Sequence, residues 1–399
     1  MHTIDSVTRQ PAVTAHPPAW GAVFSMALCV VVLIASEFMP VSLLTPIAQD
    51  LGISQGQAGQ AISISGFFAV LISLLNTPLT GRFDRKKVLL GFSLLLIVSG
   101  VIVTLASNGV VFMTGRALLG VSIGGFWSMS TATVMKLVPR ESVAKGLALI
   151  NGGNALAATV AAPLGSFLGQ YIGWRGAFFL VIPLAVLAFV WQWLSLPAMS
   201  SPPDAKARNP FKLLGKPQVA IGMGAIMLLF MGQFAVFTYL RPFLESVTGV
   251  SVTQLSLMLL SLGLMGLVGT YLIGGLLQKR IYAYLIAIPL VMALLAVALV
   301  FLGHSPKAVA LVLAFWGLVA TRAPVAWGLW LSRTLPEDAE AGGGLMVATI
   351  QLAITVGAGA GGALFDAHGW WSPFVFGAVM LAGSALAAWG ALRNSLCSR

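Results

Sequence analysis

Residues Trp20–Leu44 read WGAVFSMALCVVVLIASEFMPVSLL, and Glu37 is the one charged residue in this apolar stretch. A helix needs about twenty apolar residues to cross the hydrocarbon core of a bilayer, so the stretch is predicted to span a membrane. An ionised carboxylate at that depth is costly and needs a partner, a proton or a water-filled cavity. A carboxyl group that gains and loses a proton there can couple proton movement to another process, which favours a proton-driven transporter.

The composition of the whole chain also indicates a membrane protein. The 399 residues are 58% hydrophobic and only 8% charged, against roughly a quarter charged in soluble domains. The net charge of +11 comes from basic residues spread over short loops, so we expect a lipid bilayer around the chain and no nucleic-acid partner. The two cysteines, Cys29 and Cys397, provide neither a disulfide framework nor a metal-binding set.

Twelve stretches have the length and hydropathy of a membrane span. They cover roughly 20–45, 57–79, 88–107, 109–135, 143–169, 174–196, 217–240, 253–277, 281–302, 307–332, 343–365 and 371–392. The longest polar segment follows the sixth span and is predicted to be a flexible linker. The expected organisation is a cytoplasmic lead-in at 1–19, six-helix halves at 20–196 and 217–392, a cytoplasmic linker at 197–216 and a cytoplasmic tail at 393–399.

The basic residues predict the orientation of the spans, because cytoplasmic loops carry an excess of Lys and Arg. With both termini in the cytoplasm, seventeen of the 22 Lys and Arg residues lie on the cytoplasmic side. Arg175, Arg241 and Lys307 lie on the outer side, whereas Arg116 and Arg322 fall within spans.

The two halves of the chain repeat each other. Leu137-Val138-Pro139-Arg140-Glu141 resembles Thr334-Leu335-Pro336-Glu337-Asp338, and Gly173-Trp174 resembles Gly369-Trp370. Both pairs are separated by about half the chain, which indicates a duplication. Two related six-helix halves around a central site are common among transporters.

Several motifs between Trp20 and Leu392 resemble those of the major facilitator superfamily. Gly81-Arg82-Phe83-Asp84-Arg85-Lys86-Lys87 resembles its signature loop, although Thr80 replaces the usual leading glycine and the loop is shortened. Arg116-Ala117-Leu118-Leu119-Gly120 resembles its Arg-x-x-x-Gly motif, and Ala162-Pro163-Leu164-Gly165 resembles a weakened antiporter motif. The resemblance implies an all-α membrane protein with twelve transmembrane helices in two pseudo-symmetric halves, the major facilitator fold.

Further motifs resemble one branch of the superfamily, the drug:proton antiporters. Glu37-Phe38-Met39-Pro40-Val41 and Phe237-Thr238-Tyr239-Leu240-Arg241-Pro242 are similar to the branch with the sugar efflux transporters. The run from Pro40 to Ser54 and Gly124-Gly125-Phe126-Trp127 are closer to bacterial purine ribonucleoside efflux pumps. The resemblance implies a monomeric exporter of nucleosides such as inosine or guanosine in a bacterial inner membrane, working by alternating access.

Other functions compatible with the sequence are export of sugars, arabinose-like compounds or mixed drugs, and a passive facilitator or membrane sensor. The sequence contains no nucleotide-binding loop and no arrangement of metal ligands or catalytic nucleophiles. We therefore expect neither an enzyme nor an ATP-driven pump, and no cofactor other than protons as the coupling ion.

Glu37 and Arg116 are the candidates for proton coupling. They lie at similar distances from the outer ends of spans that run in opposite directions, so their depths are comparable. Burial disfavours the charged carboxylate, whereas a nearby arginine favours it, and a carboxyl group under both influences is suited to titration. The two side chains are therefore candidates for a salt bridge, either as a coupling element or as a static pair that holds the helices together.

A nucleoside site needs flat apolar faces and a few amide or hydroxyl groups. The candidates are the aromatic residues Phe38, Phe126, Trp127, Phe234, Phe237 and Trp327 and the amides Asn151, Asn154, Gln233 and Gln351. A single aromatic residue can instead face lipid, and a single amide can simply join two helices. Arg322 lies in a half with no acidic residue in its spans, and it either binds substrate, faces Glu37, or only reaches water.

Asp84, Arg85 and Arg140 are the candidates for gating. The resemblance implies that Asp84 latches the two halves together on the cytoplasmic side. A carboxylate there can pair with Arg140 and lie against the helix N-terminus near Gly343, where the helix dipole is positive. The alternative is a cluster of loop charges that only sets the topology.

Overall fold

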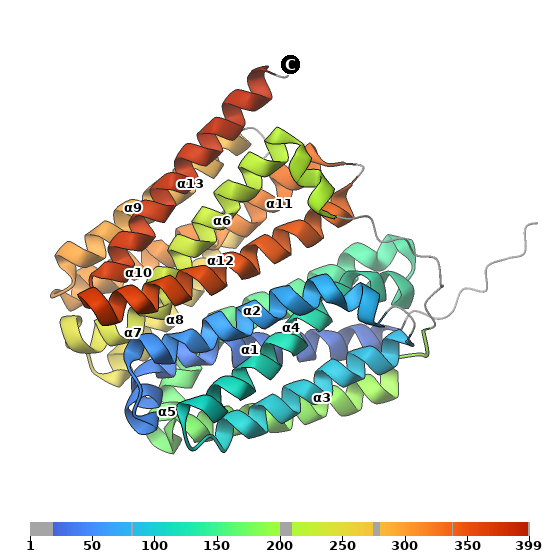
Figure 1. The fold of residues 1–399 in the computed structure, drawn as a ribbon, viewed down its shortest axis with the longest axis horizontal. Coiled ribbons are helices and arrows are strands. Elements are labelled where there is room, and N and C mark those ends of the chain that lie inside the picture. Colours follow the sequence, from blue (N-terminus) through green and yellow to red (C-terminus); the bar gives the residue numbers. More distant parts are fainter. Residues whose placement is uncertain (1–18, 81–82, 200–209, 274–279, 337, 398–399) are drawn as a thin grey trace, which may run out of the picture.

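The computed structural model describes residues 19–80, 83–199, 210–273, 280–336 and 338–397, and within these ranges it contains helices and no strands. The first bundle contains α1 (Trp20–Leu51), α2 (Gln55–Thr80), α3 (Arg85–Thr104), α4 (Gly109–Leu137), the short helix η1 (Arg140–Ser142) and α5 (Val143–Ser195). Figure 1 shows these helices side by side, coloured blue to green.

The second bundle follows the linker. It contains the short helix η2 (Pro210–Gly215), α6 (Pro217–Thr238), α7 (Leu240–Phe243), η3 (Leu244–Thr248), α8 (Val252–Ile273), α9 (Ile281–Leu302), α10 (Pro306–Ala320), α11 (Arg322–Thr334), α12 (Ala339–His368) and α13 (Ser372–Cys397). In Figure 1 its α12 lies beside α2 of the first bundle, and these two helices pack extensively.

Helix α5 crosses the membrane twice. Gly173 has φ 72° and ψ 167°, a conformation that favours glycine and interrupts the helix. The chain then folds back, since Gly146 and Ser195, near opposite ends of α5, both lie beside the first turns of α1. The described ranges contain eleven helices long and apolar enough to span a membrane. With α5 counted twice, the predicted all-α fold of twelve spans is confirmed.

The backbone repeats between the halves. The positive-φ glycines of the described residues form two pairs, Gly52 with Gly249 and Gly173 with Gly369, separated by 197 and 196 residues. Gly52 and Gly249 also share the left-handed conformation, with φ 63° and ψ 35° against φ 69° and ψ 31°. A duplicated chain that keeps the same turns explains this match.

The helix starts that follow these glycines repeat as well. Ser54 N–H donates to Gln57 Oε1 and Gln57 N–H donates to Ser54 Oγ, both at 2.9 Å. Ser251 and Gln254 form the same reciprocal pair, at 3.0 and 3.3 Å. Such a capping box satisfies two free N–H groups at a helix N-terminus. We call this end of the molecule the glycine end, and the opposite end, where α5 ends and α6 begins, the linker end.

The span predicted at 307–332 is divided in two. Helix α10 ends at Ala320 and α11 begins at Arg322. Pro324 has no N–H to donate to the carbonyl of Ala320, so the helical ladder is broken at this point. The break places Arg322 at the first position of a helix rather than in the middle of one.

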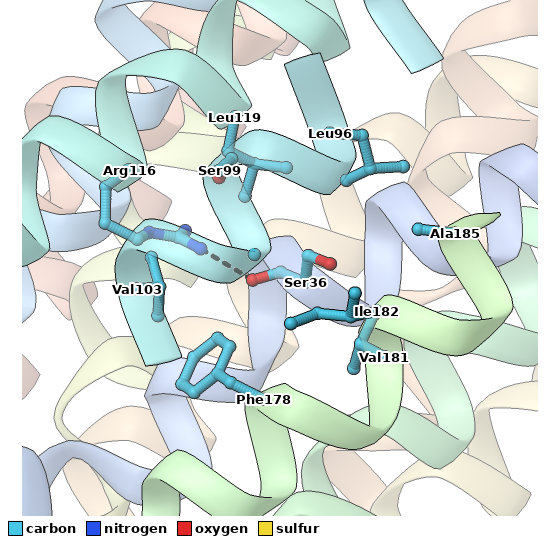
Figure 2. A pocket seen from close by; sticks show the side chains of 11 residues that line it. Ser36, Leu96, Ser99, Val103, Arg116, Leu119, Phe178, Val181, Ile182 and Ala185 are labelled. Atoms are coloured by element: carbon cyan, nitrogen blue, oxygen red, sulfur yellow. Dashed lines mark hydrogen bonds between the residues drawn. The ribbon is translucent and has the colours of Figure 1, made fainter. Parts of the chain in front are cut away.

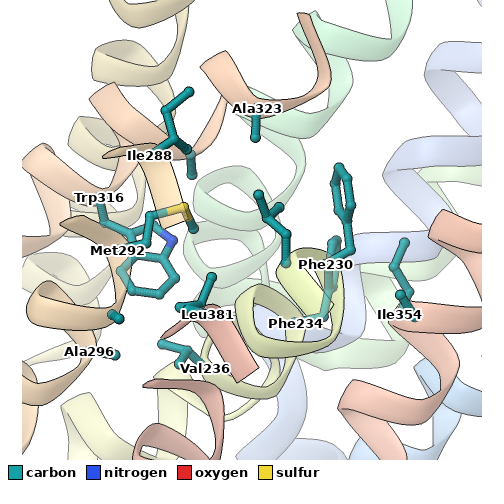
Figure 3. Packing of buried hydrophobic residues seen from close by; sticks show 14 of the residues in the cluster. Phe230, Phe234, Val236, Ile288, Met292, Ala296, Trp316, Ala323, Ile354 and Leu381 are labelled. Atoms are coloured by element: carbon teal, nitrogen blue, oxygen red, sulfur yellow. The ribbon is translucent and has the colours of Figure 1, made fainter. Parts of the chain in front are cut away.

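Each half has its own apolar core. Figure 3 shows part of the core of the second bundle, where Trp316 and Met292 pack near Leu381. A few side chains pack into the core of the other half where the bundles touch. Tyr239 of the second half packs in the first core, and Val41 of the first half packs in the second core.

Candidate functional site

Helix α1 contains two internal prolines, Pro40 and Pro46. Each lacks the N–H that would bond the carbonyl four residues earlier, which leaves the carbonyls of Ser36 and Ser42 without their helical donors. Inside a membrane such groups must find other partners, because no water is present. Both carbonyls are bound by arginines from other helices.

Arg116 of α4 binds the first of these carbonyls. Its Nη1 donates to Ser36 O at 2.6 Å and its Nη2 donates to Glu37 O at 3.0 Å. The same guanidinium donates to Ala61 O at 3.1 Å and Ser65 Oγ at 3.2 Å, both in α2. The side chain is completely buried, and Figure 2 shows it reaching towards Ser36. Arg116 therefore ties α4 to α1 and α2 at the proline kink.

The candidate salt bridge between Glu37 and Arg116 is not formed in this conformation. Of the side chains that the structure describes, none forms an ion pair with Glu37, because the donors of Arg116 are directed at backbone carbonyls and a hydroxyl. Glu37 is 1% exposed, and its Oε1 has no hydrogen-bond partner.

Gln351 of α12 lies beside the Glu37 carboxyl and brings the second half to this site. Its Oε1 is also buried without a hydrogen-bond partner. Two unpartnered oxygens on facing groups are unfavourable, because each has lost water without gaining a donor. A proton on the Glu37 carboxyl would supply such a donor, because a protonated carboxyl carries one O–H.

The void next to Arg116 in the interior of the first bundle is small. A void of about 10 Å³ lies between α1, α3, α4 and α5, lined by residues such as Ser99 and Phe178 (Figure 2). This volume is at the lower limit for a single water molecule. This void is therefore too small for any molecule larger than water.

Three of the predicted aromatic residues meet where the halves touch. Phe38 of α1 stacks on Phe234 of α6, with ring centroids 5.6 Å apart and an interplanar angle of 27°. Phe237 contacts both rings edge-on, at 6.3 Å from Phe38 and 6.0 Å from Phe234. Gln233, next in the chain to Phe234, has its Oε1 buried without a partner.

The other predicted binding residues are not gathered at this contact. Phe126 is 0% exposed and Trp327 is 1% exposed, each within the core of its own half. Trp127 and Asn154 are half-buried, whereas Asn151 is exposed and donates from Nδ2 to Leu147 O at 3.0 Å.

Arg322 keeps one unsatisfied donor. The side chain is half-buried, and its Nε is buried without a hydrogen-bond partner. Its predicted role in binding stays a prediction. No group of three or more His, Cys, Asp or Glu within the described ranges is placed to hold a metal ion.

The second freed carbonyl of α1 is bound by an arginine from the other half, a contact that the sequence analysis missed. Arg241 of α7 donates from Nη1 to Ser42 O, and from Nε to Glu245 Oε1 at 2.8 Å. The visible signal was Pro46, which indicates that Ser42 needs an external donor. The chain alone does not say which donor supplies it.

More contacts between the halves follow at the glycine end. Asp366 of α12 accepts hydrogen bonds from Ser54 Oγ and, at 2.9 Å, from Gly56 N–H at the start of α2. Gln60 Nε2 donates to Gly359 O at 3.2 Å, and the ring of Tyr239 packs directly on Gly59. These contacts hold the two halves together at this end.

Asp84 makes its contacts within the first half. Its Oδ1 accepts from Lys86 N–H at 2.8 Å, capping α3, and its Oδ2 accepts from Met199 N–H at 2.9 Å. Arg85 N–H donates to Met199 O at 3.0 Å, which fixes the chain just after α5. The side chain of Arg140 lies outside the described residues. The predicted latch between the halves therefore stays a prediction for a conformation closed at the linker end.

Comparison with known proteins gives matches that cover most of the chain. The family described as Major Facilitator Superfamily matches residues 26–346. A Pseudomonas aeruginosa protein named transcription regulatory protein OpdE is 53% identical over 91% of each chain. Proteins named purine ribonucleoside efflux pump NepI are 42% identical, over 96% of this chain and 94% of the protein from Shigella sonnei, and over 92% and 93% for Salmonella enteritidis.

A solved structure has a similar overall arrangement of helices. It is a bacterial homologue of the human lysosomal transporter Spinster, in an inward-facing and unoccupied conformation. The TM-score is 0.71 at 16% sequence identity, and the match covers 94% of this chain and 96% of that chain. At this identity the likeness concerns the fold.

Proposed function

Because the chain belongs to the Major Facilitator Superfamily, we propose that it exports purine ribonucleosides in exchange for protons. Membership confirms the family predicted from the motifs and makes the chain a multi-pass membrane transport protein rather than an enzyme. The relatives named as purine ribonucleoside efflux pumps support the substrate class. The buried, unpaired carboxyl of Glu37 supports the coupling to protons, and the proposal depends most on it.

The contact between Glu37 and Gln351 suits a carboxyl group that changes its protonation state. A protonated carboxyl donates one hydrogen bond, whereas an ionised carboxylate only accepts. A side-chain amide carries both a donor and an acceptor, so Gln351 can serve either state by turning its amide. Glu37 lies in α1 and Gln351 in α12, so loading or releasing the proton changes a contact between the two halves.

In this proposal Arg116 positions Glu37 rather than neutralising it. Four hydrogen bonds hold the guanidinium on the backbone around the Pro40 kink and on α2. The kinked turn is thereby fixed, while the carboxylate is left for the proton. The proposal therefore does not use the predicted Glu37–Arg116 salt bridge, and the proton instead changes the contact between Glu37 and Gln351.

Phe38, Phe234 and Phe237 form an aromatic cluster. In the sequence, Phe38 directly follows Glu37, and Phe234 directly follows Gln233. Aromatic rings and a few amides are the groups that recognise a flat heterocycle carrying polar edges. We place the purine ring against this cluster, with Gln233 and Gln351 as hydrogen-bond partners. The unsatisfied Nε of Arg322 is a further donor for a ribose or purine oxygen.

We assign the linker end and both termini to the cytoplasm of a bacterium, and the glycine end to the outside, because cytoplasmic loops carry an excess of Lys and Arg. With that orientation, Asp366, Arg241 and Gln60 close the outer side of the transporter. The conformation then corresponds to the step of alternating access that receives substrate from the cytoplasm. The protein acts as a monomer in this proposal.

The test is transport of inosine by purified protein in liposomes with an imposed pH gradient. Wild type should accumulate inosine against its gradient, while Glu37→Gln should lose at least about tenfold of this accumulation and keep inosine exchange in the absence of a pH gradient. The physical reason is that the glutamine side chain, unlike a carboxyl group, does not gain or lose a proton. Glu141→Gln makes the same change in the short helix η1, outside the spans, and serves as the matched control.

Undiminished accumulation by Glu37→Gln would reject the coupling residue. Uptake of a sugar or a cationic drug, with no response to inosine, would keep the transporter and reject the substrate.

A second candidate function is signalling to gene expression. The specific observation is the 53% identity to a protein named as a transcription regulatory protein. Transcript levels are compared in a strain lacking the gene and in the same strain carrying either wild type or the Glu37→Gln variant. A sensor restores the transcript levels even when substitution abolishes its transport. An exporter restores them only when it moves its substrate.

A further inference from the structure

Arg241 forms an ion pair with Glu245, next to the contact that Arg241 makes with the other half. Nε and Nη2 of Arg241 both lie 2.8 Å from Glu245 Oε1, while Nη1 donates to Ser42 O of α1. The transport proposal uses the contact with Ser42 and gives the acid no role. One guanidinium therefore binds an acid of its own half and a backbone carbonyl of the other half.

The ion pair is largely withdrawn from water. The side chain of Arg241 is 7% exposed and that of Glu245 is 24% exposed. Glu245 Oε2 is buried without a hydrogen-bond partner. Of the charged side chains that the structure describes, only Glu245 forms an ion pair with Arg241. Removing one partner of a buried ion pair is strongly unfavourable, so the closed position of Arg241 depends on this acid.

The backbone that carries the pair is a short segment distinct from the long helices. Helix α6 ends at Thr238, α7 covers only Leu240–Phe243, and η3 is a π-helical turn that contains Glu245. The turn ends at Gly249, which is in the left-handed conformation. π-Helical turns are rare and frequently occur at functional sites. Arg241 and Glu245 thus lie together in one irregular segment at the glycine end.

This segment continues the contact between the halves beyond the aromatic cluster. Phe237 contacts Phe38 with ring centroids 6.3 Å apart. Four residues further along each chain segment, Arg241 binds Ser42 O. The two contacts follow one another along α1, with the arginine contact nearer the glycine end. A molecule that leaves the cluster between these helices towards the glycine end has to pass the arginine contact.

We propose that Glu245 is a positioning residue that holds Arg241 on Ser42 and so keeps the glycine end closed. The inference rests on the proposed function for the nucleoside site behind this closure, whereas the closure itself needs no particular substrate. Without the charge of Glu245, the closed conformation contains a nearly dry cation with no counter-charge. Opening brings Arg241 into water, so loss of that charge favours the open conformation.

The experiment measures the population that is open at the glycine end, without substrate, by pulsed electron resonance. Spin labels are placed at Gln57 and His368, which are both exposed. The two native cysteines are removed by Cys29→Ala and Cys397→Ala. Glu245→Gln keeps the size of the side chain and removes its charge. It should raise the open population about tenfold, because a hydrogen bond to a charged group contributes more than a neutral one.

A double variant shows whether Glu245 acts through Arg241. Arg241→Gln alone should also raise the open population, because it removes the donor to Ser42 O. Glu245→Gln combined with Arg241→Gln should open the glycine end no further than Arg241→Gln alone, since no cation is left to position. Additive effects of the two substitutions would assign Glu245 a separate structural role and overturn the proposal.

The matched control is Asp50→Asn. It removes the charge of another acid near the glycine end, where Asp50 pairs with Arg175 inside the first half. The open population should change by less than about twofold. An equal rise in this control, or an unchanged population in Glu245→Gln, would overturn the proposal. A thermal unfolding midpoint of Glu245→Gln close to that of wild type excludes misfolding.

The outcome is independent of the substrate, because the distances are measured in its absence. A protein that opens on Glu245→Gln but does not transport inosine would support the closure and reject the proposed substrate. A protein that transports inosine and shows no opening on Glu245→Gln would keep the proposed function and reject the closure.

Discussion

At the scale of single residues, Pro40 and Arg116 act on the same carbonyl group. The proline removes the helical donor to Ser36 O, and the arginine replaces it at 2.6 Å. Glutamine or lysine cannot reproduce this, because only the guanidinium directs several donors from one planar group. Arg116 serves Ala61 O and Ser65 Oγ at the same time, so three helices depend on one side chain.

We predict that Arg116→Gln lowers the free energy of unfolding by about 3 kcal/mol, since buried carbonyls are left without donors. In a Pro40→Ala background the same substitution should cost about 1 kcal/mol less, because the N–H restored at position 40 binds Ser36 O. The measurement is a double-mutant cycle on thermal or denaturant unfolding in detergent. Strictly additive effects of the two substitutions would contradict the shared carbonyl.

The sequence predicted that Glu37 and Arg116 lie close together, but it did not predict how they pair. Apolar context and depth identified Glu37 and Arg116, and in the structure the Arg116 guanidinium in α4 binds the backbone carbonyl of Glu37 in α1. The pairing differs, because the depth of a charge can be read from a span while the direction of its side chain depends on neighbouring helices. Pro40 was a readable signal that a nearby carbonyl needed a donor.

At the scale of helices, the two prolines of α1 leave carbonyls free for arginines of both halves to bind. Pro40 directs a contact with α4 of its own half, and Pro46 directs a contact with α7 of the other half, through Arg241 and Ser42. Neither contact requires a side-chain acceptor, so a change of residue at 36 or 42 leaves the carbonyl in place. The position of each proline determines where the helix is held.

We predict that Pro46→Ala weakens the closure of the glycine end. The restored N–H competes with Arg241 for Ser42 O, and a normal hydrogen bond contributes about 1 kcal/mol. The population open at that end should rise about fivefold. Distances between spin labels at Gln57 and His368, measured by pulsed electron resonance, report this population. Pro289→Ala, in α9 and away from the interface, is the control, and equal distances in all three proteins would contradict the prediction.

Hydropathy predicted the number and approximate bounds of the spans, because burial in lipid leaves a strong signal in every one. The interruption at Thr321 was missed, although Pro324 marks it, because a proline inside a span often only bends the helix. Asp366 was also missed as an interface residue. It lies one residue beyond the predicted end of its span, and its role depends on α2, far away in the chain.

At the scale of the whole molecule, the two halves are joined at the glycine end, where Asp366 holds Ser54 and Gly56. Alternating access requires these contacts to separate once in each cycle. We predict that a Ser54→Cys, Asp366→Cys pair, in a chain with Cys29→Ala and Cys397→Ala, forms a disulfide on oxidation and lowers inosine transport at least about tenfold. Transport assays before and after reduction check this.

The single-cysteine variants serve as controls for that experiment, since oxidant should leave their transport unchanged. Recovery of transport on reduction excludes damage to the protein. An oxidised pair that transports at the normal rate would show that the glycine end does not open during the cycle.

The duplication was readable in part. Gly173-Trp174 and Gly369-Trp370 indicated it, and the structure adds identical capping boxes at Ser54 and Ser251. The sequence did not predict these capping boxes, because serine and glutamine at that spacing are common in any sequence. Their match is informative only when the turns that precede them also superimpose.

The small void beside Arg116 limits the paths by which a proton reaches Glu37. A chain of water molecules needs several linked positions, and about 10 Å³ holds at most one. In the proposed mechanism, the proton reaches Glu37 from the side of Gln351 in α12, which is also the side proposed for the nucleoside against Phe38. On that proposal, proton and nucleoside compete for the same access and exclude each other in turn. Exchange would then follow from shared access, without a direct bond between the nucleoside and Glu37.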